Sequence, residues 1–151
     1  MKKENATKKI AIIISDYNKN VTKIMLSTAS ATAKKLGIEV SDTIHVPGAL
    51  EIPFAMKNLI ESGKSSGKSG KKPDGIVALG AVIWGDTDHD IVVAHNCAAL
   101  TLKLSLKYNV PLGFGVIGPR VKLPQAEKKA EEYSRRAVET VAEMINKFSR
   151  K

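Results

Sequence analysis

The stretch of sequence that decides the fold is residues 74–108, which reads DGIVALGAVIWGDTDHDIVVAHNCAALTLKLSLKY. Residues 75–83 are apolar throughout, as a parallel strand covered on both faces should be. Residues 87–108 have the length and apolar content of a helix. Around the junction, residues 84–90 supply a tryptophan, a glycine, a threonine, a histidine and three aspartates. We therefore expect a buried strand, a polar functional loop and a helix.

The rest of the chain repeats this alternation of short apolar runs and helical patterns. Strands are predicted at residues 9–16, 39–46, 75–83 and 111–118, and helices at residues 20–37, 50–63, 87–108 and 124–148. A β-α-β-α-β-α-β-α order is typical of a parallel sheet with right-handed crossovers and helices on both faces. We expect one α/β domain over residues 1–151, a three-layer sandwich built on a four-stranded parallel sheet.

A polar segment follows each predicted strand. The segments read SDYNKN (15–20), HVPGALEIP (45–53), WGDTDHD (84–90) and GPRVKLP (118–124). Ligands of open α/β sheets bind in the crevice outside the carboxyl ends of the strands. We therefore expect these four segments to meet at one edge of the sheet and to form a single site.

The segment 84–90 has the features of an anion site at the start of a helix. Thr87 and Asp90 have the spacing of a capping box, and Gly85 lets the backbone approach a ligand closely. The free N–H groups of a first helical turn attract anions such as phosphate. A helix cap without further function is the alternative interpretation.

His89 lies in this first turn, where phosphate chemistry needs a proton carrier. The three aspartates beside it favour its protonated form, but they also repel a phosphate. A nearby cation must therefore offset these acids. The candidates follow the fourth predicted strand and are Lys122, Lys128 and Lys129.

Two further side chains near strand ends have more than one interpretation. Glu51, near the start of the second helix, either complements the helix dipole or binds a polar ring that carries N–H donors. Tyr17, after the first strand, either packs or stacks on a flat heterocycle. His45 and His95 have no partners at the spacing of metal ligands, so no metal site is expected. The sequence also contains no glycine-rich dinucleotide fingerprint.

The positive charge of the chain does not indicate a nucleic-acid site. The net charge is +9, but the excess lies in residues 1–9, 62–72 and 146–151. No basic helix with interleaved aromatic residues occurs. We expect residues 1–8 to be a flexible N-terminus and residues 62–73 to form an exposed Gly/Ser/Lys loop.

The sequence gives no sign of a membrane partner. No run approaches the ~20 apolar residues that span a bilayer, and the lysine-rich start has no long apolar segment behind it, so we expect no secretory signal. The single cysteine, Cys97, lies in an apolar run, and we expect it to be a small core residue. These features are typical of a protein in a reducing cytoplasm.

Four segments match one family of proteins. They are SDYN (15–18), VPGALEIPFAMKNL (46–59), LGAVIWGDTDHD (79–90) and GFGVIGP (113–119), and they occur in the expected order over essentially the whole chain. Together they resemble the 6,7-dimethyl-8-ribityllumazine synthase family. The pattern GPRVKLPQAEKKAEEYSRRAVE at residues 118–139 is more similar to the archaeal branch than to the bacterial one.

The resemblance implies a flavodoxin-like fold and the penultimate step of riboflavin synthesis. Members condense 5-amino-6-(D-ribitylamino)uracil with (S)-3,4-dihydroxy-2-butanone 4-phosphate, release phosphate and water, and use neither a metal nor an organic cofactor. Their sites lie between adjacent subunits of a pentamer. A homo-oligomer is therefore implied, either a free pentamer or a shell of sixty subunits.

The resemblance also assigns residues to roles. His89 matches the catalytic proton carrier, and Tyr17 matches the aromatic that stacks on the pyrimidine. Phe114 matches a residue that lines the pocket of a neighbouring subunit. Lys129 is the closest match to a bacterial arginine of the phosphate site, although the glycine-rich stretch that follows this arginine is absent here. The remaining substrate-binding positions are Asn18, Ala49, Leu50, Glu51, Ala81, Val82, Ile83, Gly85, Asp86 and Thr87.

Two alternative functions are compatible with this scaffold. One is the archaeal-type riboflavin synthase, which has a related fold but lacks the Gly-x-Thr-x-His pattern found here at residues 85–89. The other is a non-catalytic module that binds flavins or nucleotides.

Overall fold

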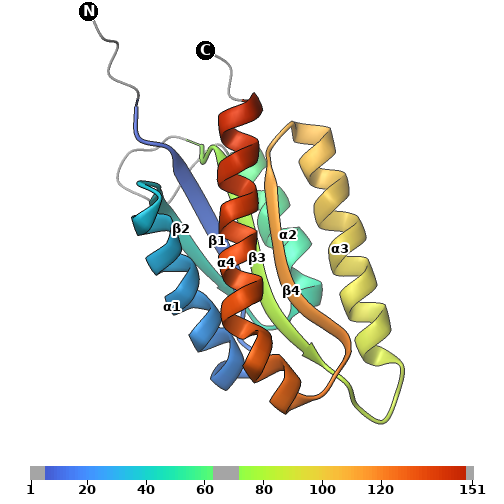
Figure 1. Ribbon diagram of the computed structural model, residues 1–151. Helices are drawn as coiled ribbons and strands as arrows, with labels where there is room; N and C mark the ends of the chain where they lie inside the picture. The colour runs from blue at the N-terminus through green and yellow to red at the C-terminus, as the bar shows by residue number, and fades with distance from the viewer. Residues whose placement is uncertain (1–5, 63–71, 149–151) are drawn as a thin grey trace, which may run out of the picture.

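The computed structural model describes residues 6–62 and 72–148. The expected flexible N-terminus (1–8) and Gly/Ser/Lys loop (62–73) lie mostly outside the described residues. The elements follow one another in the predicted order (Figure 1): β1 (Lys9–Ser15), α1 (Lys19–Lys35), β2 (Glu39–Val46), the 3₁₀ turn η1 (Ala49–Glu51), α2 (Ile52–Ser62), β3 (Gly75–Ile83), α3 (His89–Tyr108), β4 (Leu112–Val121) and α4 (Leu123–Phe148).

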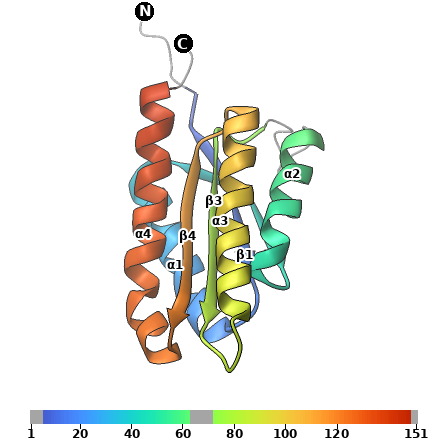
Figure 2. The same ribbon diagram turned by 90° about the vertical axis from the view of Figure 1, so that its right-hand side faces the viewer.

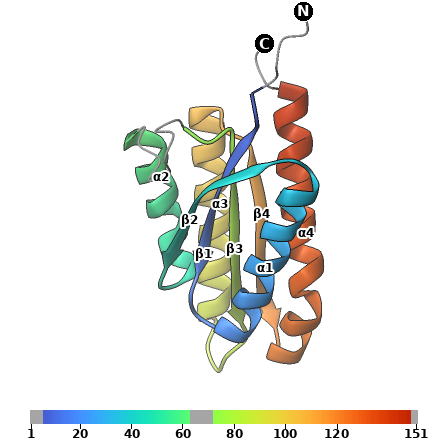
Figure 3. The same ribbon diagram turned by 90° about the vertical axis from the view of Figure 1, so that its left-hand side faces the viewer.

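The four strands form one parallel sheet in the order β2-β1-β3-β4. Helices α1 and α4 cover one face of the sheet, and α2 and α3 cover the other, as the two side views in Figure 2 and Figure 3 show. The predicted three-layer α/β sandwich with a four-stranded parallel sheet is therefore confirmed. No helix of the described residues is both long enough and apolar enough to cross a membrane.

Two apolar clusters hold the helices to the sheet. Ile12 packs in the cluster under α1 and α4 with Val138, and Ile13 packs in the cluster under α2 and α3 with Met56. Successive side chains of a strand point to opposite faces. The central strand β1 is covered on both faces, which explains why residues 10–14 are all apolar.

The strand order creates a crevice between the carboxyl ends of β1 and β3. From β1 the chain moves outward to the edge strand β2, and it then crosses back past β1 to β3. The connection after β1 leads to α1 on one face, whereas the connection after β3 leads to α3 on the other. Open α/β sheets bind ligands at such a switch point, so the segments 15–20 and 84–90 lie where a site is expected.

The start of α3 differs from the prediction. The helix begins at His89, and the predicted capping box of Thr87 and Asp90 is wrong. Asp88 is the N-cap residue and makes no side-chain cap hydrogen bond, while the His89 N–H donates to Thr87 Oγ1 at 3.3 Å. Asp90 Oδ2 instead accepts the backbone N–H of Arg120 at 2.8 Å, because β4 ends beside the first turn of α3.

The fourth strand is longer than predicted. Pairing with β3 resumes after a register shift, so that Ile83 lies opposite Val121. The Trp84 N–H then donates to the Val121 carbonyl at 2.9 Å. This extension carries the chain of β4 past the predicted end at residue 118 and brings it alongside the polar segment 84–90.

Candidate active site

A pocket of about 600 Å³ occupies the crevice at the carboxyl ends of the strands. Three of the four polar segments meet there, as the sequence predicts, and the segment after β4 borders the pocket without lining it. The lining residues are Tyr17, Asn18, Gly48, Ala49, Leu50, Glu51, Ala81, Val82, Ile83, Trp84, Gly85, Thr87, His89, Asp90 and Val93.

Asn18 joins the two strand ends that flank the crevice. Its side-chain Nδ2 donates to the carbonyl of Ala81 on β3 at 2.9 Å. Its backbone adopts a left-handed conformation with φ of 61° at the N-cap of α1. Asparagine enters this region more easily than most residues, so one residue both turns the chain into α1 and fixes the segment after β1 to β3.

Tyr17 lies over the backbone at the end of β2. The Tyr17 N–H donates to the carbonyl of Pro47 at 3.1 Å. A Cβ added at Gly48 would lie 2.9 Å from Tyr17 Cδ2, so only glycine fits under the ring. Tyr17 is 67% exposed, so its ring is accessible for stacking on a flat ligand.

Glu51 closes the short turn η1 that precedes α2. Its N–H donates to the carbonyl of Gly48 at 3.1 Å, and its exposed carboxylate reaches the pocket. An acid in a first turn also complements the helix dipole. Both interpretations of Glu51 are compatible with this position, because the same carboxylate lies at the start of a helix and at the wall of a pocket.

His89 is the first residue of the twenty-residue helix α3 and is exposed toward the pocket wall. Asp88 before it is exposed, whereas Asp90 after it is only 4% exposed. The site therefore presents an accessible imidazole at a positive helix end, with one buried and two exposed acids, Asp86 and Asp88, around it.

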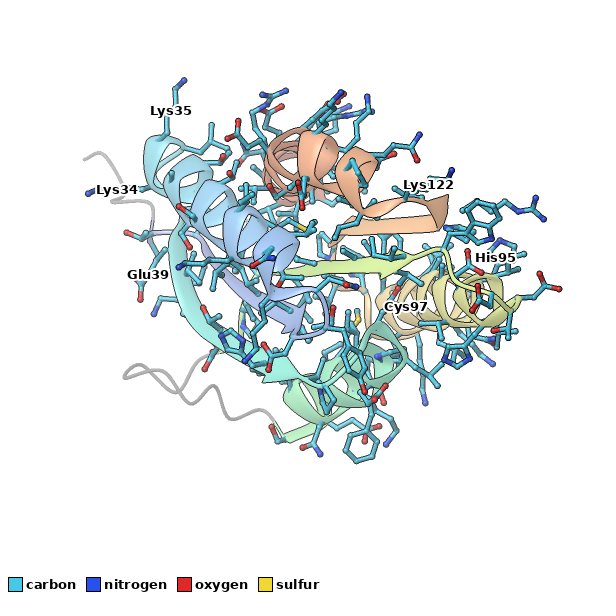
Figure 4. All side chains as sticks on the ribbon, turned by 90° about the horizontal axis from the view of Figure 1, so that it is seen from below. Lys34, Lys35, Glu39, His95, Cys97 and Lys122 are labelled. Carbon is cyan, nitrogen blue, oxygen red and sulfur yellow. The ribbon has the colours of Figure 1, made fainter. Side chains whose placement is uncertain are left out.

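The segment after β4 brings one cation, Lys122, to a residue that lines this pocket. Lys122 Nζ lies 5.5 Å from the centroid of the Trp84 ring, within the range of a cation–π contact. In Figure 4, which is seen from the carboxyl ends of the strands, Lys122 lies at the end of β4, and His95 lies on α3. Trp84 lines the pocket, so Lys122 is held at its edge.

Comparison with known proteins agrees with this arrangement. A family model described as 6,7-dimethyl-8-ribityllumazine synthase matches residues 7–149. This chain belongs to the 6,7-dimethyl-8-ribityllumazine synthase family. Similar proteins of that name include one from Staphylothermus marinus, 43% identical over 92% of this chain and 87% of its own length. Another from Metallosphaera sedula is 40% identical over 96% and 91%, and one from Methanococcus aeolicus is 34% identical over 93% and 97%.

Most residues that the lumazine synthase resemblance assigns to the site do line the pocket, but Asp86, Phe114 and Lys129 do not. Asp86 lies in the exposed loop before α3. Phe114 lies on the edge strand β4 and is 37% exposed. Lys129 Nζ lies 3.5 Å from Glu132 Oε2 on the exposed side of α4. The assigned roles of these three residues stay predictions.

Four lining residues were not singled out as substrate contacts from the sequence. Gly48 and Trp84 lie within the motifs that carry the family resemblance, so the sequence contains a signal for both as pocket residues. The spacing of Asp90 predicts a helix cap, whereas its partner, Arg120, lies thirty positions away. Val93 lies one helical turn after His89 and on the same face of α3.

The remaining candidate residues have structural roles. Cys97 is fully buried in the core under α3, as predicted, and burial raises the pKa of its thiol to about 12. His45 Nδ1 lies 2.8 Å from Asp16 Oδ1, so the side chain of His45 is paired with a carboxylate. Within residues 6–62 and 72–148, no three His, Cys, Asp or Glu side chains are grouped as metal ligands would be.

Proposed function

We propose that this chain condenses 5-amino-6-(D-ribitylamino)uracil with (S)-3,4-dihydroxy-2-butanone 4-phosphate to give 6,7-dimethyl-8-ribityllumazine. Phosphate and water leave, and the reaction is the penultimate step of riboflavin synthesis. The observation that carries this proposal is the pocket of about 600 Å³ that His89, Tyr17 and Glu51 line together. Membership of the lumazine synthase family supports it, and it makes the chain a transferase.

The chemistry needs two bound substrates more than it needs an exceptional acid. Holding an amine beside a ketone in a reactive orientation supplies a large share of the rate. A histidine can change its protonation state near neutral pH. We assign to His89 the proton transfers of imine formation and phosphate loss, because its side chain is exposed at the pocket.

The pyrimidine substrate is assigned to the β1 and β2 side of the pocket. There Tyr17 presents an accessible ring for stacking, and Glu51 offers an acceptor to the N–H donors of the uracil. Residues 49–51 and 81–83 form the two walls, and Asn18 fixes the segment after β1 to the second of them at Ala81.

The phosphate is assigned to the start of α3, where residues 85–87 supply backbone N–H groups. Exposed aspartates surround this position, so a side-chain cation must contribute as well. Lys129 matches the bacterial arginine and is our first candidate for that cation. Lys122 is another candidate, because its contact with Trp84 brings it to the rim of the pocket.

We further propose that the chain works as a pentamer or as a multiple of pentamers. The outer face of α3 exposes large apolar side chains, among them Val92 (52%), Leu102 (54%) and Leu106 (75%). Several large apolar side chains exposed on one helix are consistent with a protein interface. We assign Phe114, which is 37% exposed on the edge strand β4, to the pocket of a neighbouring copy. We expect this assembly to act in the cytoplasm.

The test is an assay that separates the three candidate functions. Purified protein is incubated with both substrates, and the lumazine chromophore is followed by absorbance against a control without enzyme. A lumazine synthase forms the chromophore faster than the control. A riboflavin synthase forms none from these substrates but converts added lumazine to riboflavin. A non-catalytic module does neither, and this last result would refute the proposal.

A further inference from the structure

One buried acid beside the pocket has no part in the proposed chemistry. Asp90 is only 4% exposed, although two other aspartates of the same loop are exposed. Its Oδ2 accepts the Arg120 N–H at 2.8 Å. Its Oδ1 is buried and has no hydrogen-bond partner within the described residues. Burying a carboxylate costs free energy unless its bonds are satisfied, so this position calls for an explanation.

Asp90 connects the first turn of α3 to Arg120, near the end of β4. Arg120 has φ of 62°, a left-handed conformation that is unfavourable for most residues other than glycine. Its N–H nevertheless donates to Asp90, so the carboxylate supports an otherwise costly backbone geometry. Asp90 directly follows His89 on α3, and Arg120 lies two residues before Lys122.

Residues 121 and 122, which follow Arg120, make two further contacts with the pocket wall. The Trp84 N–H donates to the Val121 carbonyl at 2.9 Å, and Lys122 Nζ lies 5.5 Å from the Trp84 ring centroid. Three contacts in succession, through residues 120, 121 and 122, therefore fix the path of the chain. Of these three contacts, the one with Asp90 is made by a side chain of α3.

We propose that Asp90 is a positioning residue: its carboxylate holds the backbone of Arg120, so that Lys122 stays over Trp84 at the phosphate end of the pocket. The inference rests on the proposed function for the identity of the phosphate substrate. The inference predicts that loss of the hydrogen bond between Asp90 and Arg120 impairs phosphate binding alone. Phosphate affinity falls, because Lys122 is no longer held at the rim, while the pyrimidine side around Tyr17 is unaffected.

The test uses Trp84, which is the only tryptophan of the chain. Its fluorescence is titrated with inorganic phosphate, a readout that does not require turnover. Lys122 can contribute at most one screened charge contact, so Asp90→Ala is expected to weaken phosphate binding roughly 2- to 10-fold. The Michaelis constant for the butanone phosphate should rise by a similar factor, and that for the ribitylaminouracil should change less than about twofold.

Two companion variants separate positioning from charge and from stability. Asp90→Asn keeps an oxygen that can accept the Arg120 N–H, so it should retain most of the phosphate affinity even where it lowers thermal stability. Asp88→Asn removes an exposed acid next to the same turn without breaking this hydrogen bond, and it should not weaken phosphate binding. Lys122→Met keeps the apolar contact with Trp84 but removes the charge, and adding Asp90→Ala to it should cause little further loss.

The inference is overturned if folded Asp90→Ala binds phosphate as the parent does, or if both Michaelis constants rise equally. It is also overturned if Asp90→Asn loses as much phosphate affinity as Asp90→Ala, since charge and not the hydrogen bond would then be responsible. A parent protein that binds phosphate with these variant effects but forms no lumazine would refute the proposed function and leave the positioning role standing.

Discussion

The side chain of Asn18 donates to the carbonyl of Ala81 at 2.9 Å, and this bond joins the carboxyl ends of β1 and β3. The two strands flank the switch point of the sheet. Beyond the paired part of these strands, the Asn18 amide group fixes the segment after β1 to β3, and Asn18 sits at the entry to α1 in a left-handed conformation.

Substitution at Asn18 should separate the effects of its conformation and of its hydrogen bond. Asn18→Gly removes the bond but keeps φ of 61° accessible, and we expect a loss of about 1 kcal/mol in the free energy of unfolding. Asn18→Ala adds the backbone cost of about 1–2 kcal/mol. Urea unfolding of both variants measures the difference, and equal stabilities would contradict this account.

Gly48→Ala should disturb substrate binding through Tyr17. The added Cβ would lie 2.9 Å from Tyr17 Cδ2, so the ring must move. We expect the Michaelis constant for the ribitylaminouracil to rise about 3- to 30-fold, on the scale of a lost aromatic stacking contact. The constant for the butanone phosphate should change little.

A double variant provides the control for this argument. In Tyr17→Ala the obstructing ring is absent, so adding Gly48→Ala should have almost no further effect on the pyrimidine constant. Additive losses would mean that Gly48 acts on the substrate directly and not through Tyr17.

The fold follows from local patterns, which is why it could be predicted. The apolar run of residues 75–83 and the polar segments after each strand required no knowledge of distant contacts, and parallel topology then brought those segments to one edge. The pocket residues Tyr17, Glu51 and His89 all stand directly after strands or at helix starts. Their convergence follows from the order of the elements.

Long-range contacts could not be predicted in the same way. Asp90 has the spacing of a capping residue, but its carboxylate instead accepts a backbone N–H from β4. The extension of β4 to Val121 depends on pairing with Ile83 after a register shift, which no local pattern encodes. Phe114 and Lys129 do not line the pocket of the single chain, so their roles stay predictions.

Lys129→Ala should raise the Michaelis constant for the butanone phosphate about 2- to 10-fold, as expected for one screened charge contact. The ribitylaminouracil constant should not change. Lys129 already lies 3.5 Å from Glu132, so Glu132→Gln is a matched variant that frees the cation and should not impair phosphate binding. Kinetics at low and high salt provide the measurement. If Lys129→Ala and the parent respond identically to salt, Lys129 is not the cation.

Subunit mixing tests whether the site is shared between copies. Phe114→Ala should lower kcat/KM about 5- to 10-fold through a lost aromatic contact, and His89→Ala should be slower still. Co-assembly of the two variants would restore sites that combine His89 of one copy with Phe114 of another. The mixture should therefore exceed the sum of the separate activities.

The matched control for mixing pairs His89→Ala with Tyr17→Ala. Both residues line the pocket of the same chain, so no mixed site is intact and no recovery is expected. Recovery in this control would mean that His89 and Tyr17 of different chains form one site, and no recovery in the Phe114 mixture would place the sites within single chains. Sedimentation of an active monomer would do the same.

The most direct test of the account is the initial rate of lumazine formation by His89→Ala, compared with His95→Ala. Both histidines are exposed on α3, but only His89 lines the pocket. We expect His89→Ala to keep its fold and to slow the reaction about 10- to 1000-fold, the range of general acid–base contributions when substrate proximity is retained. His95→Ala should keep the parent rate. A His89→Ala variant that forms lumazine at the parent rate would contradict the assignment of this pocket as the catalytic site.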